Sequence, residues 1–202
     1  MNLQSGSQPL TPGGPALHRC FYALRFSAGV NAYLVTIIEA LKRHGADVRW
    51  VPARNIHLTL RFLGELTDEQ FSHARTIPNP PAIGEISLRA RGLGAFPLMR
   101  APRALWAGVE GETRDDTDRL LRIQGMTEEW ARRIGLPREN RSYSPHITLG
   151  RVARPSPGLR ALTDDIISRE CISDYAAIGE MVLMRSVLSG GATYEEVARF
   201  EV

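Results

Sequence analysis

Two copies of one four-residue pattern constrain how this chain folds more than any other feature. The sequence reads HLTL from His57 and HITL from His146, in each case a histidine, an aliphatic residue, a threonine and another aliphatic residue. Successive side chains of a β-strand point to opposite faces, so each copy would present its histidine and threonine together and bury its aliphatic pair. With five histidines in a chain that is 43% hydrophobic, two such matches arise by chance in on the order of one in a thousand chains. The repeat therefore predicts two strands that bring two imidazoles and two hydroxyls to one space.

Length and composition favour a soluble globular protein. The 202 residues are enough for one large domain or for two small lobes that share an interface. No apolar stretch is long enough to span a bilayer, and no signal segment opens the chain. Cys20 and Cys171 lie far apart without metal-ligand spacing, so we expect reduced thiols in a cytoplasmic, monomeric protein. A pI near 9.2 is compatible with an RNA partner.

The pattern of apolar residues and turn residues divides the chain into a tail and one domain. Residues 1–17 are rich in Gly, Pro, Ser and Gln without periodicity, which predicts a flexible tail before a single domain over residues 18–202. Strands are expected at 18–26, 48–51, 56–63, 86–93, 104–109, 143–152, 181–188 and 193–200. Helices are expected at 30–44, from Thr67 to the proline run 78–81, at 115–134 and at 159–168, and a hairpin turn at 189–192.

The order of these elements predicts an α+β fold. Each half of the chain contains one of the two histidine patterns, and hairpins join some of the strands. The simplest arrangement is bilobal, with two pseudo-symmetric lobes of antiparallel-rich sheet and outer helices around a central cleft. Each lobe would then give one histidine strand to the cleft.

Two histidines and two threonines are suited to phosphodiester chemistry. Imidazole titrates near neutrality, so one histidine can accept a proton while the other donates one. Threonine hydroxyls and a nearby arginine can hold the phosphate oxygens. A lone histidine in a strand is more often structural, but the repeat argues against that interpretation here. No third ligand accompanies the histidines, so a metal or other cofactor is not expected. The sequence also lacks a G-x-S-x-G nucleophile elbow and a P-loop.

The surroundings of both patterns resemble a known family. They are similar to the two-histidine phosphoesterases, in the branch called RNA 2′,3′-cyclic phosphodiesterase and historically 2′-5′ RNA ligase. The likeness covers about residues 19–202. The matching segments are 19–24 (RCFYAL), 49–51 (RWV), 55–64 (NIHLTLRFLG), 92–97 (GLGAFP), 102–109 (PRALWAGV), 144–151 (SPHITLGR) and 186–194.

The resemblance implies a bilobal α+β fold and an activity that needs no metal. It implies hydrolysis of a terminal 2′,3′-cyclic phosphate on RNA to a 2′-phosphate, with 2′-5′ ligation as a reverse activity. His57 and His146 would be the catalytic residues, and Thr59 and Thr148 would bind the phosphate. The residues alone leave open which histidine is the acid and which the base.

Further candidates flank the two patterns. The resemblance also implies that Arg151, the arginine after the second pattern, binds phosphate, but its odd spacing from His146 would turn it away from the cleft unless a bulge or a strand end intervenes. Arg61, four residues after His57, would face the cleft in a regular strand, or else be a solvated arginine at a strand end. Candidates for stacking a base, with packed aromatic residues as the alternative, are Tyr22, Phe96 and Tyr143.

Two other functions are compatible with the same residues. The chain could be an RNA- or nucleotide-binding module without turnover, although the intact histidines argue against that. It could also be a phosphodiesterase that acts on small cyclic nucleotides rather than on RNA ends.

Overall fold

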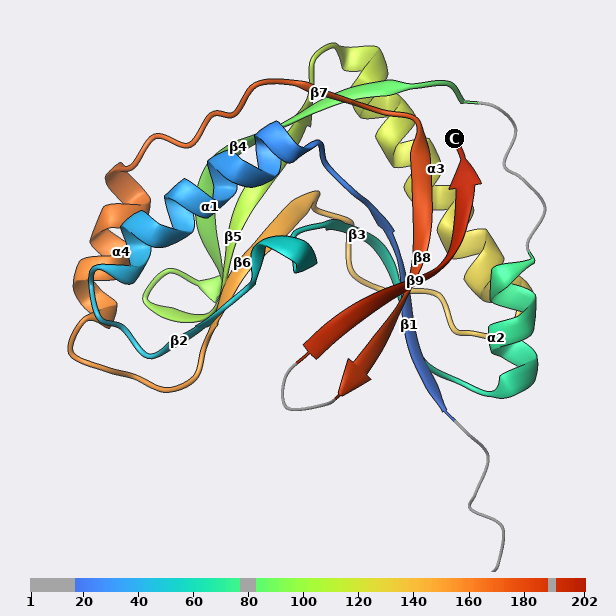
Figure 1. Cartoon of the computed structure of the whole chain (residues 1–202), viewed down its shortest axis with the longest axis horizontal. Coiled ribbons are helices and arrows are strands. Elements are labelled where there is room, and N and C mark those ends of the chain that lie inside the picture. Colours follow the sequence, from blue (N-terminus) through green and yellow to red (C-terminus); the bar gives the residue numbers. More distant parts are fainter. Residues whose placement is uncertain (1–16, 77–82, 189–191) are drawn as a thin grey trace, which may run out of the picture.

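A computed structural model describes residues 17–76, 83–188 and 192–202, whose strands form one curled antiparallel sheet with helices packed on it (Figure 1). The strands are β1 (His18–Leu24), β2 (Val48–Trp50), β3 (Leu58–Leu66), β4 (Ile86–Leu98), β5 (Ala101–Gly111), β6 (His146–Val152), β7 (Ala176–Ile178), β8 (Glu180–Leu188) and β9 (Ala192–Glu201). The helices are α1 (Ala28–Lys42), the short 3₁₀ helix η1 (Ala53–Asn55), α2 (Asp68–Arg75), α3 (Arg114–Arg133) and α4 (Leu159–Ser168).

The sheet consists of two lobes that meet between the two histidine strands. The strand order is β7-β4-β5-β6-β3-β1-β8-β9, and β2 pairs with β6. One lobe holds β3, β1, β8 and β9, and the other holds β6, β5, β4 and β7. The lobes join where Leu58 of β3 pairs with Ile147 of β6. The predicted fold class, an α+β protein of two antiparallel lobes with outer helices, is confirmed.

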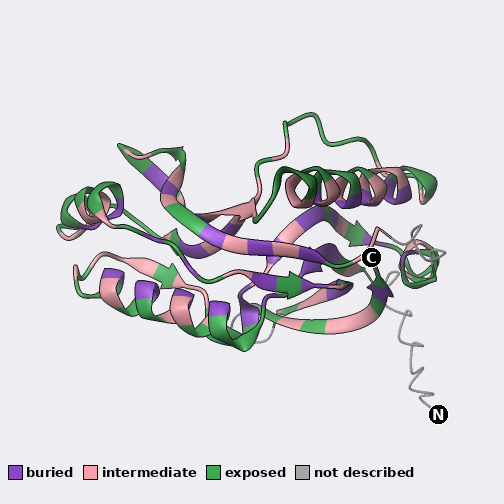
Figure 2. Cartoon of the chain, turned by 90° about the horizontal axis from the view of Figure 1, so that it is seen from above, coloured by how far each residue is buried: buried purple, intermediate pink, exposed green. Residues whose placement is uncertain are grey.

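The helices bury apolar stripes against the sheet. In α1 the buried residues are Val30, Leu34, Ile37, Ile38 and Leu41, which recur at helix spacing. In α3 they include Leu120, Ile123 and Trp130. Figure 2 shows these stripes as purple bands on the helix sides turned toward the strands. The helices thus cover one face of the sheet, the face that carries the aliphatic residues of the two histidine patterns.

Capping residues fix where helices begin. Thr67 was expected to start a helix, and its hydroxyl accepts a hydrogen bond from the backbone N–H of Gln70, whose side chain accepts one from the backbone N–H of Thr67. Thr113 and Asp116 form the same capping box at α3. No helix in the described part of the chain is long and apolar enough to cross a membrane.

Element boundaries agree with the predictions to within a few residues, with some exceptions. The predicted helix at 159–168 is α4 as observed, whereas β4 and β5 run longer than predicted because they form one long hairpin. The short strand β7, which pairs with β4, was not predicted. The predicted tail, the proline run 78–81 and the turn at 189–192 fall wholly or mostly outside the described residues.

Candidate active site

The two histidines face the same side of the sheet. Leu58 and Ile147 are paired across the lobe junction and both are 0% exposed, on the helix-covered face. The residues on either side of them therefore point to the opposite face, which we call the inner face. In an antiparallel register this sets His57 beside Thr148 and Thr59 beside His146. The histidines are then diagonal neighbours, which in an ordinary ladder lie roughly 7–8 Å apart.

Both imidazoles are anchored in the same way. The Nδ1 atom of His57 lies 2.6 Å from the carbonyl oxygen of Asn55, and that of His146 lies 2.7 Å from the carbonyl oxygen of Ser144. A carbonyl oxygen only accepts, so each Nδ1 carries the hydrogen, and in the neutral ring each Nε2 is left without one. The Nε2 of His57 lies 3.1 Å from the hydroxyl of Thr59. The repeat thus produces two imidazoles that are oriented in the same way through Nδ1.

The surroundings of His57 lower its pKa. The largest cause is burial, which disfavours the charged imidazole, and the hydrogen bond to the Asn55 carbonyl acts in the opposite direction. The positive charges of Arg151 and Arg25, together with His146, lower the pKa further. His57 is therefore neutral at pH 7, and the two arginines and the second histidine lie within electrostatic reach of it.

Aromatic rings hold each histidine in place. His57 stacks on Phe21 with ring centroids 4.8 Å apart, and Tyr194 meets it edge-on at 5.3 Å. His146 is met edge-on by Phe96 at 5.0 Å, and Trp106 lies 6.4 Å from it. These contacts restrict both imidazoles to the orientation that their Nδ1 hydrogen bonds define.

A β-bulge follows the threonine of each pattern and decides which arginine reaches the site. On β6, Thr148 pairs with Trp106 and Gly150 pairs with Leu105, so Leu149 has no partner on β5. The extra residue reverses the alternation and turns Arg151 to the inner face with Thr148. Arg151 is an odd number of residues from His146, and this is the bulge that it needs in order to share a face with His146.

The equivalent bulge on β3 removes Arg61 from the site. Ala23 pairs with Thr59 and Tyr22 pairs with Arg61, so Leu60 is the unpaired residue. The prediction that Arg61 faces the cleft and binds phosphate is wrong, because the bulge turns its side chain to the helix-covered face.

On that face Arg61 serves the fold. Its side chain is 9% exposed and its Nε lies 3.0 Å from a carboxylate oxygen of Glu128 in α3. Its guanidinium also donates hydrogen bonds to the carbonyl oxygens of Phe62, at 2.7 Å, and Pro137, at 2.5 Å. Arg61 therefore joins β3 to α3 and to the segment after it.

The three candidate stacking residues lie in different environments. Tyr22 is 0% exposed and its hydroxyl donates to the carbonyl oxygen of Ala74, so it is a core residue and the stacking prediction is wrong for it. Tyr143 is partly buried, and its hydroxyl donates to the carbonyl oxygen of Thr59, which favours a structural role. Phe96 is 36% exposed beside His146, and base stacking remains a prediction for it.

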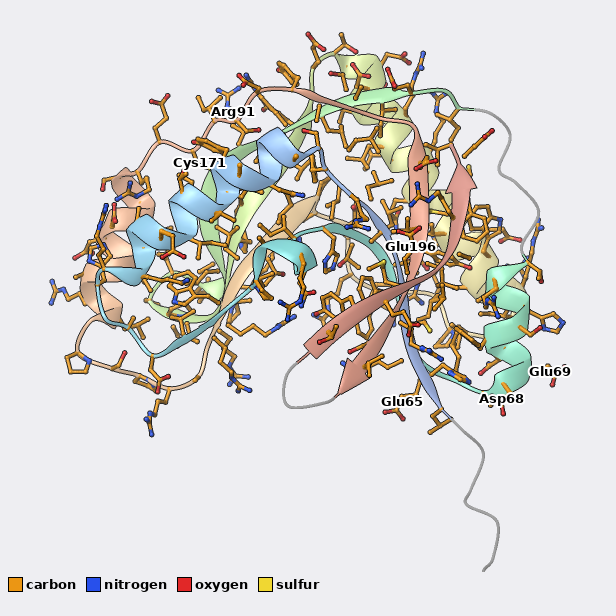
Figure 3. All side chains as sticks on the ribbon, in the orientation of Figure 1. Glu65, Asp68, Glu69, Arg91, Cys171 and Glu196 are labelled. Carbon is orange, nitrogen blue, oxygen red and sulfur yellow. The ribbon has the colours of Figure 1, made fainter. Side chains whose placement is uncertain are left out.

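Several inner-face residues were not singled out as site candidates from the sequence, among them most of the aromatic residues that contact the histidines and two further side chains, Arg25 and Phe62. Arg25 follows β1, and its guanidinium lies 3.1 Å from a carboxylate oxygen of Glu196. Glu196 belongs to β9 and is labelled in Figure 3. Phe62 is 43% exposed and stacks parallel to Phe21 at 5.9 Å. Phe62 stands five residues after His57, as Arg151 stands five residues after His146, so alignment of the two patterns would have revealed it.

The described residues contain no group of three or more His, Cys, Asp or Glu side chains arranged to hold a metal ion. The residues that surround the two histidines are threonines, arginines and aromatic rings. Hydroxyls and guanidiniums bind anions, and aromatic rings pack against flat, apolar groups. This set of side chains therefore suits an anionic ligand that carries a flat, apolar group better than it suits a cation.

Comparison with known proteins agrees with this geometry. Residues 26–106 match the model of the LigT-like phosphoesterases. An RNA 2′,3′-cyclic phosphodiesterase of Thermotoga maritima is 32% identical over 153 residues, which cover 73% of this chain and 77% of the relative. One of Methanothermobacter thermautotrophicus is 31% identical over 192 residues, covering 91% and 98%.

Solved structures show the same fold. A Thermus thermophilus protein superposes with a TM-score of 0.71 at 26% identity, covering 91% of this chain and 97% of that one. Escherichia coli LigT complexed with 3′-AMP superposes with a TM-score of 0.67 at 26% identity, covering 93% and 99%. The chain with its two oriented histidines belongs to the LigT-like phosphoesterase family.

Proposed function

We propose that this protein hydrolyses the 2′,3′-cyclic phosphate at the end of an RNA to a 2′-phosphate, with His57 and His146 as acid and base. The observation that carries the proposal is the matched anchoring of the two imidazoles, each fixed through Nδ1 and each offering Nε2 on the inner face. The relatives named RNA 2′,3′-cyclic phosphodiesterase support the choice of substrate.

The reaction needs one proton removed and one supplied. One Nε2 takes a proton from water as the water oxygen bonds to phosphorus, and the bond from phosphorus to the ribose O3′ breaks. The other histidine enters the step as an imidazolium, with hydrogens on both ring nitrogens, and gives its Nε2 proton to that O3′, which leaves the phosphate on O2′. Each such proton transfer typically contributes 10²- to 10⁴-fold to the rate.

The threonines and Arg151 hold the phosphate during this exchange. The hydroxyls of Thr59 and Thr148 lie in the register positions beside the histidines, where they can donate to the non-bridging oxygens. Arg151 adds a positive charge that the β6 bulge directs to the same face. In this proposal the three donors together stabilise the charge that develops on the phosphate oxygens.

The same geometry supports ligation. A ribose 5′-hydroxyl in the position of the attacking water would form a 2′-5′ phosphodiester, with the same proton acceptor and the same proton donor. Since imidazoles supply both the acid and the base, we propose that neither direction requires a metal ion.

Hydrolysis of an oligonucleotide that ends in a 2′,3′-cyclic phosphate, measured in EDTA, tests the proposal. We expect turnover to a 2′-phosphate by the wild type and a loss of at least a hundredfold in His57→Ala and in His146→Ala. Saturable binding without product would instead identify a binding module. Full activity of both variants would refute the roles of the histidines.

A further inference from the structure

Arg49 and Arg151 lie directly opposite each other on neighbouring strands, β2 and β6. Val48 and Trp50, on either side of Arg49, are packed against the core, so the exposed Arg49 side chain points to the inner face, as Arg151 does. Directly opposed residues of an antiparallel pair have Cα atoms only about 4.5–5.5 Å apart. Two arginine side chains therefore leave the sheet from adjacent positions on the same face.

This pair differs from two other arginines of the sheet, each of which lies opposite a glutamate. Arg89 faces Glu110 with a nitrogen–oxygen distance of 2.6 Å, and Arg185 faces Glu195 at 2.7 Å. Like charges in opposed positions destabilise a sheet, whereas opposite charges stabilise it. Over residues 17–76, 83–188 and 192–202, neither Arg49 nor Arg151 has an ion pair or a hydrogen bond from its side chain. The pair is thus arranged as a receptor for negative charge that the protein itself does not supply.

The position of the pair relates it to the histidines. β3 and β2 follow one another along the same edge of β6, with β3 paired at Ile147 and β2 paired from Gly150 to Val152. Arg151 is close enough to lower the pKa of His57, and Arg49 lies beyond Arg151 on the next strand. The positive charge therefore continues from the candidate active site toward the β2 edge.

Resting on the proposed function, we propose that Arg49 binds the phosphodiester on the 5′ side of the terminal nucleotide while Arg151 binds the cyclic phosphate. The planar guanidinium matches two phosphate oxygens at once, so two arginines in adjacent positions provide one such donor for each phosphate group of the terminal nucleotide. A mononucleoside cyclic phosphate has no 5′ phosphodiester. Arg49 thus makes the enzyme selective for RNA ends over small cyclic nucleotides.

The test compares two substrates and two variants. The kcat/KM of the full-length protein is measured on a 2′,3′-cyclic nucleoside phosphate and on a dinucleotide that ends in the same cyclic phosphate. Arg49→Gln is the test variant. Arg138→Gln is the matched control, because Arg138 is exposed in the segment after α3 and forms no ion pair among the described residues.

We expect Arg49→Gln to lower kcat/KM about tenfold on the dinucleotide and to leave the mononucleotide unchanged, since one charged hydrogen-bonding partner is lost. Arg138→Gln should alter neither rate. An equal loss on both substrates, or no loss on the dinucleotide, overturns the assignment of Arg49 while the proposed function stands. A wild type inactive on both substrates overturns the proposed function, and this inference with it.

Discussion

Replacement of Arg61 by methionine tests the conclusion that Arg61 stabilises the fold whereas Arg151 faces the candidate site, because a bulge before each arginine decides which face its side chain takes. The side chain is 9% exposed and its partner Glu128 is 17% exposed, so Arg61→Met leaves a carboxylate poorly solvated and without its cation. It also removes the donors to the carbonyl oxygens of Phe62 and Pro137. Breaking a buried pair in this way costs about 3–5 kcal/mol.

Because Glu128 keeps some access to water, we expect a value near the lower end, about 3 kcal/mol. For a domain of this size each kcal/mol shifts the midpoint by about 2–4 °C, so the Tm should fall by about 6–12 °C. The value of kcat/KM at a temperature where the variant is folded should change less than threefold.

Arg151→Met is the matched control, and it should show the reverse behaviour. Its exposed side chain predicts a stability change within about 0.5 kcal/mol, and its proposed contact with the phosphate predicts a loss of kcat/KM on the order of a hundredfold. Thermal unfolding followed by circular dichroism and initial-rate assays measure both quantities. If Arg61→Met were as stable as the wild type and as inactive as Arg151→Met, the reasoning about the bulge would be refuted.

Two further predictions concern the histidines and their supports. His57 has a lowered pKa in the folded protein, so stability should be intact above the ordinary histidine pKa of about 6.5 and fall as the pH drops toward the lowered value, because the unfolded chain takes up the proton first. Urea unfolding at several pH values should show that His57→Gln loses this dependence. The same pH dependence of stability in the wild type and in His57→Gln would contradict the prediction. A Cβ on Gly94 would lie 2.2 Å from the Trp106 ring, so Gly94→Ala should cost about 1–3 kcal/mol and lower kcat by displacing the ring near His146. Gly125→Ala in α3, where a Cβ meets nothing within 4 Å, should be neutral or stabilising, and equal effects of the two changes would count against the argument.

The sequence predicted the centre of the site because strand alternation is a local property. His57 and Thr59 share a face, as do His146 and Thr148, for the same reason that Leu58 and Ile147 meet in the core. The lobes and the order of elements followed from apolar spacing and turn residues in the same way.

What lay beyond the bulges could not be predicted from alternation. Leu60 and Leu149 look like ordinary strand residues, yet Leu60 has no partner on β1 and Leu149 has none on β5. Each bulge reverses the facing of the arginine that comes after it. The facing of Tyr22 was equally hidden. It lies between Phe21 and Ala23 in a strand buried on both faces, where the apolar pattern does not distinguish core from inner face.

Single-turnover hydrolysis by His57→Ala, His146→Ala and the double variant tests most directly whether the two histidines act as one unit. Groups that cooperate in one step are strongly non-additive, so the account predicts that the double variant is about as slow as the slower single variant. Rate losses that multiply in the double variant, or a single variant that keeps the wild-type rate, would contradict it.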